Sequence, residues 1–192
     1  MVAESPFHGS TVILRAIEPG DAGLLHGWMN HPDVLGCRYA AWETPDYAPL
    51  STAQVEGILQ EWAGAKNELH LMVTLRKDET PIGYAACDWG WDAHTQGVSV
   101  VIAPPYRRKG YGSEALRLLL GYQFGYSPAH SIACWMADWN EPGRRFAARN
   151  GFREVGCLRR AGMRAGAFYD TVTADLLRPE WEALCGGENN AS

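Results

Sequence analysis

A turn of basic residues and glycines carries the clearest chemical signal in the sequence, with the order Arg107-Arg108-Lys109-Gly110-Tyr111-Gly112. The cationic side chains would attract an anion. Gly110 and Gly112 lack a Cβ atom, so that anion could approach the backbone closely. The pattern therefore predicts a phosphate site, most simply one for a diphosphate. The alternative is an ordinary basic turn at the protein surface.

A strand before this turn and a helix after it would hold the turn in place. Residues 98–102 are rich in β-branched side chains and predict a buried strand, which Pro104 and Pro105 end because proline cannot donate to a ladder. Behind the turn, apolar residues recur at helical spacing, at Ala115, Leu118, Leu119 and Tyr122. A helix that begins here would direct its free N–H groups and the positive end of its dipole at the bound anion.

Two common glycine loops do not fit the turn. A Walker loop needs G-x-x-x-x-G-K-[ST], whereas Lys109 precedes Gly110. A dinucleotide fingerprint needs G-x-G-x-x-G, whereas position 115 is Ala. The order R-x-x-G-x-G, beginning at Arg107, is instead similar to the pyrophosphate loop of the GNAT superfamily of acetyl-CoA-dependent N-acetyltransferases.

Further segments extend this resemblance over roughly residues 10 to 182. Asn140, followed eleven residues later by Gly151-Phe152, resembles the second cofactor segment of the superfamily. Other short segments resemble its RimJ/RimL-type branch, namely Leu14-Arg15, Asp21, 31–34, 156–159, Tyr169-Asp170 and 176–181.

The resemblance implies a GNAT fold of the α/β (α+β) class, in which the two central strands splay apart. The predicted strands occur both in hairpins and across helices, so a mixed sheet of six or seven strands with helices on both faces is expected. The expected strands are 11–17, 69–76, 81–89, 98–102, 131–139, 153–158 and 168–177. Helices are expected after an Asp21 cap, after a Ser51 capping box and after an Asn140 cap. Residues 90–97 are expected to form a polar turn.

Length and composition predict one soluble domain. At 192 residues the chain suits a single domain over 11–185, with an N-terminal extension at 1–10 and a disordered tail at 186–192. Neither a leader-like N-terminus nor an apolar run of membrane-spanning length is recognised. The five cysteines are widely spaced and contain no C-x-x-C pair, so we expect a reduced, cytoplasmic protein without a metal.

The charge distribution is uneven. The net charge of −5 argues against general nucleic-acid binding. Residues 1–100 hold 5 basic and 13 acidic side chains, a net of −8, and residues 101–192 hold 12 and 9, a net of +3. Such a division suits a cationic acceptor on one side and a polyphosphate on the other. Chance surface composition is the alternative.

The resemblance also assigns the residues that would bind acetyl-CoA. The backbone of Val100, Val101 and Ile102 would pair with the pantetheine amides as an added strand. The diphosphate would lie on the turn, which comprises Arg107, Arg108, Lys109, Gly110, Tyr111, Gly112 and Ser113. Asn140 would contact the pantetheine arm.

The resemblance also implies catalytic positions, and none of them holds its familiar side chain here. A carboxylate would fall near Gly97, a Glu at Trp135, a Tyr at Ala147 and, in the RimJ/RimL-type branch, a Ser at Gly143. In one interpretation the enzyme works by positioning the amine, and a water chain removes its proton. Asp138 and Asp170 are then the preferred carboxylates, although Asp138 is also a candidate cap partner and Asp170 a candidate strand-end structural residue. In the other interpretation the chain binds acetyl-CoA and acts as a sensor or assembly partner.

The expected acceptor is a primary amine, either a protein N-terminus or a small amine such as a polyamine or an aminoglycoside. Residues assigned to its pocket are Trp28, His31, Trp89, Trp135 and Tyr169. The aromatic side chains could hold a cationic amine by cation–π attraction or could serve in ordinary packing. The acyl group is acetyl or a longer chain. A homodimer is one possibility, because dimers are common in the superfamily.

Overall fold

The computed structural model describes residues 5–35 and 48–189. They fall into two compact units, Met1–Asp88 with Val98–Tyr122 and Trp89–Gly97 with Gln123–Ser192. The strands are β1 (Val12–Ala16), β2 (Glu68–Leu75), β3 (Pro81–Asp92), β4 (Thr95–Ile102), β5 (Ser131–Ala137), β6 (Arg153–Arg164) and β7 (Ala167–Leu177). The helices are α1 (Ala22–Met29), α2 (Thr52–Gly64), α3 (Tyr111–Tyr126), α4 (Glu141–Arg149) and α5 (Arg178–Asn189), with 3-10 turns η1 (Pro19–Asp21) and η2 (Pro104–Tyr106).

The seven strands form one mixed sheet in the order β1-β2-β3-β4-β5-β7-β6. β4 and β5 run parallel, and their register pairs join Thr95 to Ser131 and Gly97 to Ala133. β2 pairs with β3, and β5 with β7, in the antiparallel sense. The expectation of a mixed sheet of six or seven strands with divergent central strands is confirmed.

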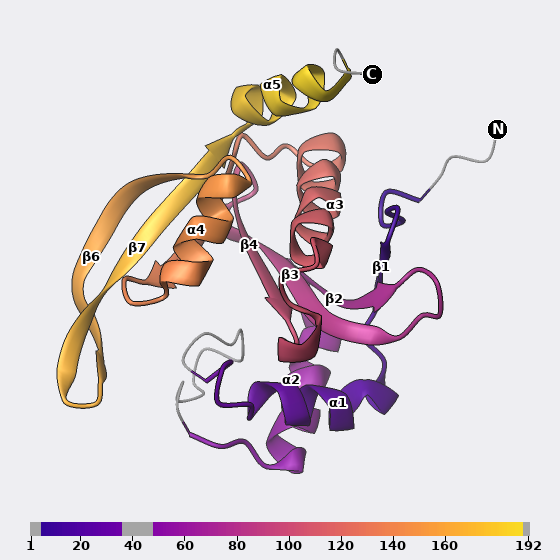
Figure 1. The fold of residues 1–192 in the computed structure, drawn as a ribbon, viewed down its shortest axis with the longest axis vertical. Helices are drawn as coiled ribbons and strands as arrows, with labels where there is room; N and C mark the ends of the chain where they lie inside the picture. The colour runs from indigo at the N-terminus through magenta and orange to yellow at the C-terminus, as the bar shows by residue number, and fades with distance from the viewer. Residues whose placement is uncertain (1–4, 36–47, 190–192) are drawn as a thin grey trace. The chain divides into compact units, whose positions relative to one another are not determined.

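The first unit has its core between two helices and the β2–β3 hairpin. Apolar side chains of α1 and α2 pack on the hairpin in one buried cluster of Leu25, Met29, Leu50, Val55, Ile58, Trp62, Met72 and Tyr84. α1 and α2 lie against one face of these strands and α3 against the other (Figure 1). The Ser51 capping box is confirmed, because Ser51 Oγ accepts the Gln54 N–H at 3.2 Å and Gln54 Oε1 accepts the Ser51 N–H at 2.8 Å.

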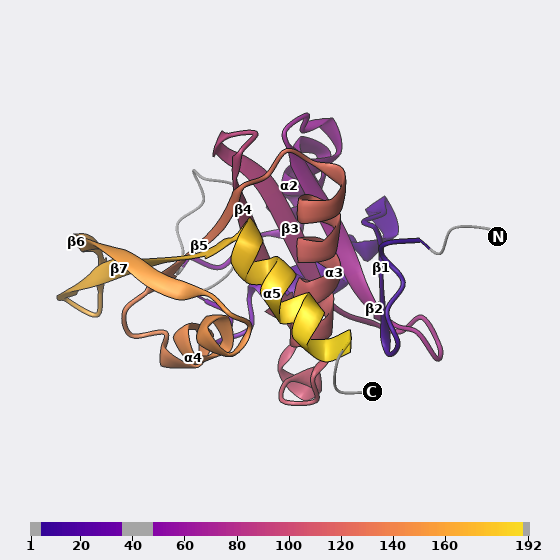
Figure 2. The same ribbon diagram turned by 90° about the horizontal axis from the view of Figure 1, so that it is seen from above.

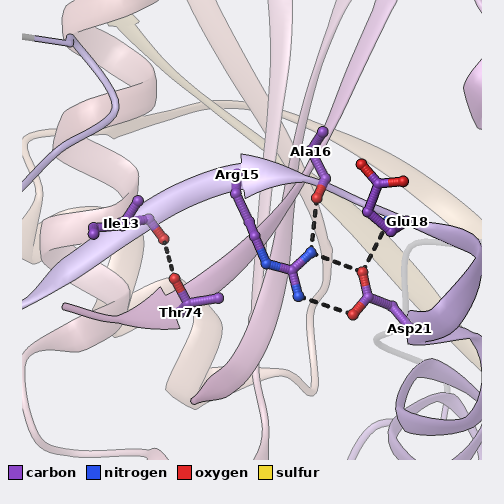
Figure 3. A network of polar contacts seen from close by, with 6 residues as sticks. All are labelled: Ile13, Arg15, Ala16, Glu18, Asp21 and Thr74. Carbon is purple, nitrogen blue, oxygen red and sulfur yellow. Dashed lines mark hydrogen bonds and ion pairs between the residues drawn. The ribbon is translucent and has the colours of Figure 1, made fainter. Parts of the chain in front are cut away.

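Asp21 is the N-cap residue of α1, as expected, but its carboxylate makes no cap bond at the start of that helix. It instead accepts two hydrogen bonds from the Arg15 guanidinium, at 2.8 and 2.9 Å, and one from the Glu18 N–H at 2.8 Å (Figure 3). The Asp21 carboxylate is thus occupied by Arg15 of β1 and by the Glu18 N–H, because a bidentate arginine–carboxylate contact is among the strongest hydrogen-bonded pairs.

In the second unit, two segments that were not predicted to be strands belong to the sheet. The expected polar turn at 90–97 is wrong, because β3 continues to Asp92 and β4 begins at Thr95. Asp92 Oδ1 accepts the N–H groups of His94 and Thr95, at 2.6 and 2.9 Å, so the turn is much shorter. β6 and β7 are also longer than expected and meet at Ala165 and Gly166, both in the left-handed region.

The ends of α4 follow the sequence pattern. Asn140 Oδ1 accepts the Gly143 N–H at 3.1 Å, and Gly151, with φ of +93°, terminates the helix region. Beyond α4, β6 and β7 form a long twisted ribbon, visible in two orientations (Figures 1 and 2). α5 follows β7 directly and runs to Asn189, so the helix includes the beginning of the expected tail.

Candidate active site

The predicted phosphate turn lies in the first unit, between η2 and α3. Gly110 has φ of +86°, and a Cβ built on it meets no atom within 4 Å. Its carbonyl accepts the Glu114 N–H at 3.1 Å, which is the first bond of the helix. The N–H groups of Tyr111, Gly112 and Ser113 therefore precede that bond and lie in the first helical turn, where N–H groups bind anions. The geometry fits a phosphate cradle.

The three cations of the turn differ in their contacts. Arg107 Nε donates to the Ile102 carbonyl at 2.8 Å, and its Nη2 donates to the Asp33 carbonyl at 3.5 Å, so this guanidinium braces the turn on the end of β4. Arg108 is exposed and has φ of +61°. Lys109 Nζ lies 5.7 Å from the centre of the Tyr106 ring. All three cations are exposed, although Arg107 is already bonded to backbone carbonyls.

The end of β4 is held against β3. A Cβ on Gly83 would lie 2.2 Å from the Val101 carbonyl oxygen, so glycine is required for this close approach. The Ala103 N–H donates to the Ile82 carbonyl at 2.8 Å. The predicted pantetheine strand, Val100 to Ile102, is half-buried, and Val101 packs on the core of the first unit. Strand addition at this segment stays a prediction.

Asn140 belongs to the second unit, where its side chain caps α4. A Cβ on Gly143 would lie 2.6 Å from Asn140 Nδ2. A serine at position 143, as the RimJ/RimL-type branch often has, would therefore displace the Asn140 side chain. Ala147, at another familiar catalytic position, is buried in the same helix.

The two candidate carboxylates are neighbours in the second unit. The Asp138 N–H donates to the Asp170 carbonyl at 2.8 Å. The Asp170 carboxylate accepts the Arg160 N–H at 2.7 Å and lies 3.5 Å from the Cys157 thiol. These bonds hold a bulge of β6, which favours the structural role for Asp170. Catalysis by either carboxylate stays a prediction.

The predicted acceptor residues are divided between the units. In the first unit, Trp28 packs on the core, and His31 Nδ1 accepts the Asp33 N–H at 3.1 Å. In the second unit, Trp89 and Trp135 are 45% and 44% exposed, which is unusual for tryptophan. Tyr169 meets the Trp139 ring edge-on at 6.3 Å. Trp89 and Trp135 are therefore the two most exposed of the five residues assigned to the acceptor pocket.

Two side-chain contacts in the structure were not predicted from the sequence. The Arg164 guanidinium lies 3.9 Å from the centre of the Trp139 ring, a contact that only the register of the β6–β7 hairpin reveals. Gln123, fully buried on α3, donates at 3.1 Å to both Gln96 Oε1 and the Gly97 carbonyl, where β4 and β5 pair. A glutamine within the buried face of a predicted helix was the sequence feature that could have indicated the Gln123 contacts.

The described residues also bear on metals and membranes. Within 5–35 and 48–189, no three His, Cys, Asp or Glu side chains gather in a way that could hold a metal ion. None of the helices in those ranges is long and apolar enough to cross a bilayer. Burial raises the pKa of the Cys87 and Cys134 thiols to about 12, so neither is a nucleophile near neutral pH.

Sequence comparison links the chain to acetyltransferases. The family model described as an acetyltransferase (GNAT) domain matches residues 11–153. The chain is 28% identical over 109 residues to the uncharacterized N-acetyltransferase YnaD of Bacillus subtilis (strain 168), covering 57% of this chain and 64% of YnaD. It is 28% identical over 88 residues to the prophage-derived N-acetyltransferase YokL of the same strain, covering 46% and 50%. The chain thus spans half to just under two thirds of these relatives.

Solved structures share the fold. A GNAT-family acetyltransferase from Bacillus anthracis superposes with a TM-score of 0.77 at 21% identity, covering 90% of this chain and 98% of that one. A spermidine N-acetyltransferase from Vibrio cholerae, in complex with CoA and spermine, superposes with a TM-score of 0.76 at 22% identity, covering 90% and 99%. The seven-stranded sheet and its five helices match these neighbours.

Proposed function

Because the chain belongs to the GNAT family of acetyltransferases, we propose that it transfers the acetyl group of acetyl-CoA to a primary amine. The acceptor is a protein N-terminal amine or a small amine such as a polyamine or an aminoglycoside. The chain is of the RimJ/RimL type, works in the cytoplasm and can form a homodimer. Curated relatives with N-acetyltransferase in their names support the reaction class.

The observation that carries this proposal is the open cradle at the start of α3. A Cβ built on Gly110 would meet no atom within 4 Å, and the neighbouring Arg108 and Lys109 are exposed. Backbone N–H groups at a helix N-terminus together with cations are the donor set that a diphosphate requires. We assign the CoA diphosphate to residues 107–113, the pantetheine amides to Val100–Ile102 and its arm to Asn140. The CoA complex of the Vibrio cholerae neighbour supports such a ligand.

The chemistry is a direct attack in a ternary complex. The amine nitrogen attacks the thioester carbonyl, the new C–N bond forms and the C–S bond breaks; the amine loses a proton and the departing thiolate gains one. Holding the reactants in line can lower the barrier by about 7 kcal/mol without an acid or a base. Asp138 and Asp170 are the proposed general bases that take the proton. Trp89 and Trp135 are the proposed aromatic contacts of the amine substrate.

One observation favours a second function. The positions at which many GNAT enzymes hold a Glu and a Tyr are here Trp135 and Ala147, and Ala147 is buried. A chain without these groups could bind acetyl-CoA as a sensor or an assembly partner and transfer slowly. Cofactor affinity without turnover would distinguish this function from catalysis.

The test is release of free thiol from acetyl-CoA against a panel of amines. The panel holds short peptides with free N-termini, polyamines, aminoglycosides and free amino acids, and calorimetry measures acetyl-CoA affinity in parallel. Thiol release with one class establishes the enzyme and its acceptor. Acetyl-CoA binding with no release across the panel favours the sensor or a larger protein acceptor. Absence of binding rejects both.

A further inference from the structure

The β6–β7 hairpin has an open hollow of about 600 Å³ lined by Cys157, Leu158, Arg159 and Arg160. It lies where the register of β6 against β7 shifts between Leu158 and Gly162. A bulge of this kind redirects side chains away from the regular ladder. Asp170 of β7 holds the bulge through the Arg160 N–H, so its shape is fixed by the hairpin itself.

The hollow has cations without matching anions. Within the described ranges, neither Arg159 nor Arg160 forms an ion pair with a carboxylate, and the Arg160 guanidinium lies 5.4 Å from the centre of the Phe168 ring. The two acidic residues in 153–170 already have partners, and neither partner is the guanidinium of Arg159 or Arg160. Glu154 accepts Arg144 at 2.7 and 2.9 Å, and Asp170 holds the bulge. The planar forks of two arginines therefore face solvent where a carboxylate would pair with them.

Large apolar side chains of the same hairpin are also exposed. Val155, Leu158, Met163 and Phe168 are 59%, 66%, 55% and 59% exposed. β6 is also the edge strand of the sheet. Exposed apolar groups gathered on one element mark an interaction surface more often than an ordinary solvent face. Whatever covers this hairpin must supply both apolar contacts and negative charge.

We propose that the hairpin surface formed by residues 155–168 binds an acidic segment of a partner polypeptide that also carries apolar side chains. Its carboxylates pair with Arg159 and Arg160, and its apolar groups cover Leu158 and the neighbouring exposed residues. A second copy of this hairpin is disfavoured, because 153–170 hold four arginines against two acids and like charges would face one another. The interaction does not require acetyl transfer.

The test measures binding of a fluorescent peptide by anisotropy with the full chain. The peptide is N-acetylated and free of lysine, so it cannot be an acceptor, and it alternates Asp or Glu with Leu, Val or Phe. The control peptide has Asn and Gln at the acidic positions. We expect the acidic peptide to bind, and the affinity to fall by about tenfold or more in the double variant Arg159→Ala/Arg160→Ala and in Leu158→Ser. Added salt should weaken binding.

Arg149→Ala on α4, which changes an exposed arginine outside the hollow, should leave the affinity unchanged. Equal affinity for the acidic and amide peptides, or for wild type and the double variant, overturns the proposal. So does a dimer, detected by sedimentation velocity, that Leu158→Ser dissociates, because a second copy would then cover the hairpin. Loss of amine acetylation in the thiol assay, with peptide binding intact, would count against the proposed function and not against this surface.

Discussion

The Asn140 side chain occupies the space that a side chain at position 143 would need. Asn140 Oδ1 accepts the Gly143 N–H at 3.1 Å, and a Cβ on Gly143 would lie 2.6 Å from Asn140 Nδ2. A serine at this position would therefore require the Asn140 side chain to move from its place in the helix cap.

Gly143→Ser should accordingly destabilise the protein without creating a catalytic group. The Asn140 side chain must rotate away and lose its cap bond, which costs about 1 kcal/mol of the free energy of unfolding. Urea denaturation measures this loss. Gly125→Ser on α3, where a Cβ meets nothing within 4 Å, is the matched control and should change stability much less. An unchanged free energy of unfolding in Gly143→Ser would contradict the contact.

Gly110→Trp should abolish measurable acetyl-CoA binding, because the indole would fill the cradle that the diphosphate is proposed to enter. Calorimetry with acetyl-CoA measures the affinity. A left-handed backbone also strains any residue other than glycine by about 1 kcal/mol or more, so stability alone would be ambiguous. Gly166→Trp is the control, since Gly166 has φ of +81° and equally open surroundings at the β6–β7 turn. Equal acetyl-CoA affinity in wild type and Gly110→Trp would remove the turn assignment.

Local patterns predicted the elements that short-range chemistry determines. The Ser51 capping box, the β2–β3 hairpin and the Asn140–Gly151 helix depend on residues within a few positions of one another. The turn at 107–112 was found in the same way, because its glycines and cations are adjacent. The spacing also predicted a helix directly behind it, where α3 begins.

Long-range pairing decided what the sequence could not show. Residues 90–97 look like a polar turn, yet Thr95–Gly97 pair with β5, thirty-six positions further along the chain. Asp21 is the N-cap of α1, yet its carboxylate pairs with Arg15 on β1. The Asp170 carboxylate holds a bulge whose position depends on the β6–β7 register, and its catalytic role stays a prediction. In each case the sequence alone did not show which strand the residue would meet.

Replacement of both candidate carboxylates tests proton removal. Asp138→Asn/Asp170→Asn should lower kcat by about 100-fold and change the pH–rate profile, if a carboxylate accepts the amine proton as a general base. Asn at 170 can still accept the Arg160 N–H, so the hairpin should remain folded, which circular dichroism checks. The single variants identify the residue responsible. A pH–rate profile that the double variant leaves unmoved would reject both carboxylates and favour the water-chain mechanism.

The Arg15–Asp21 ion pair should make stability depend on pH in the acid range. Hydrogen bonds from the Arg15 guanidinium and from the Glu18 N–H hold the pKa of the Asp21 carboxyl below its usual value. A carboxyl whose folded pKa is depressed stabilises the fold above its unfolded pKa, about 3.9, and this contribution is lost as the pH falls through the lower folded pKa. Asp21→Asn should therefore lower the free energy of unfolding by about 1–3 kcal/mol at pH 7.

The difference between wild type and Asp21→Asn should shrink as the pH falls below about 4, because protonated Asp21 no longer pairs with Arg15. Urea denaturation at a series of pH values from neutral to strongly acidic measures it. Glu56→Gln, on the exposed side of α2, provides the control for removal of one negative charge. A difference that stayed constant from pH 7 down to pH 2 would mean that Asp21 acts through packing and not through its charge.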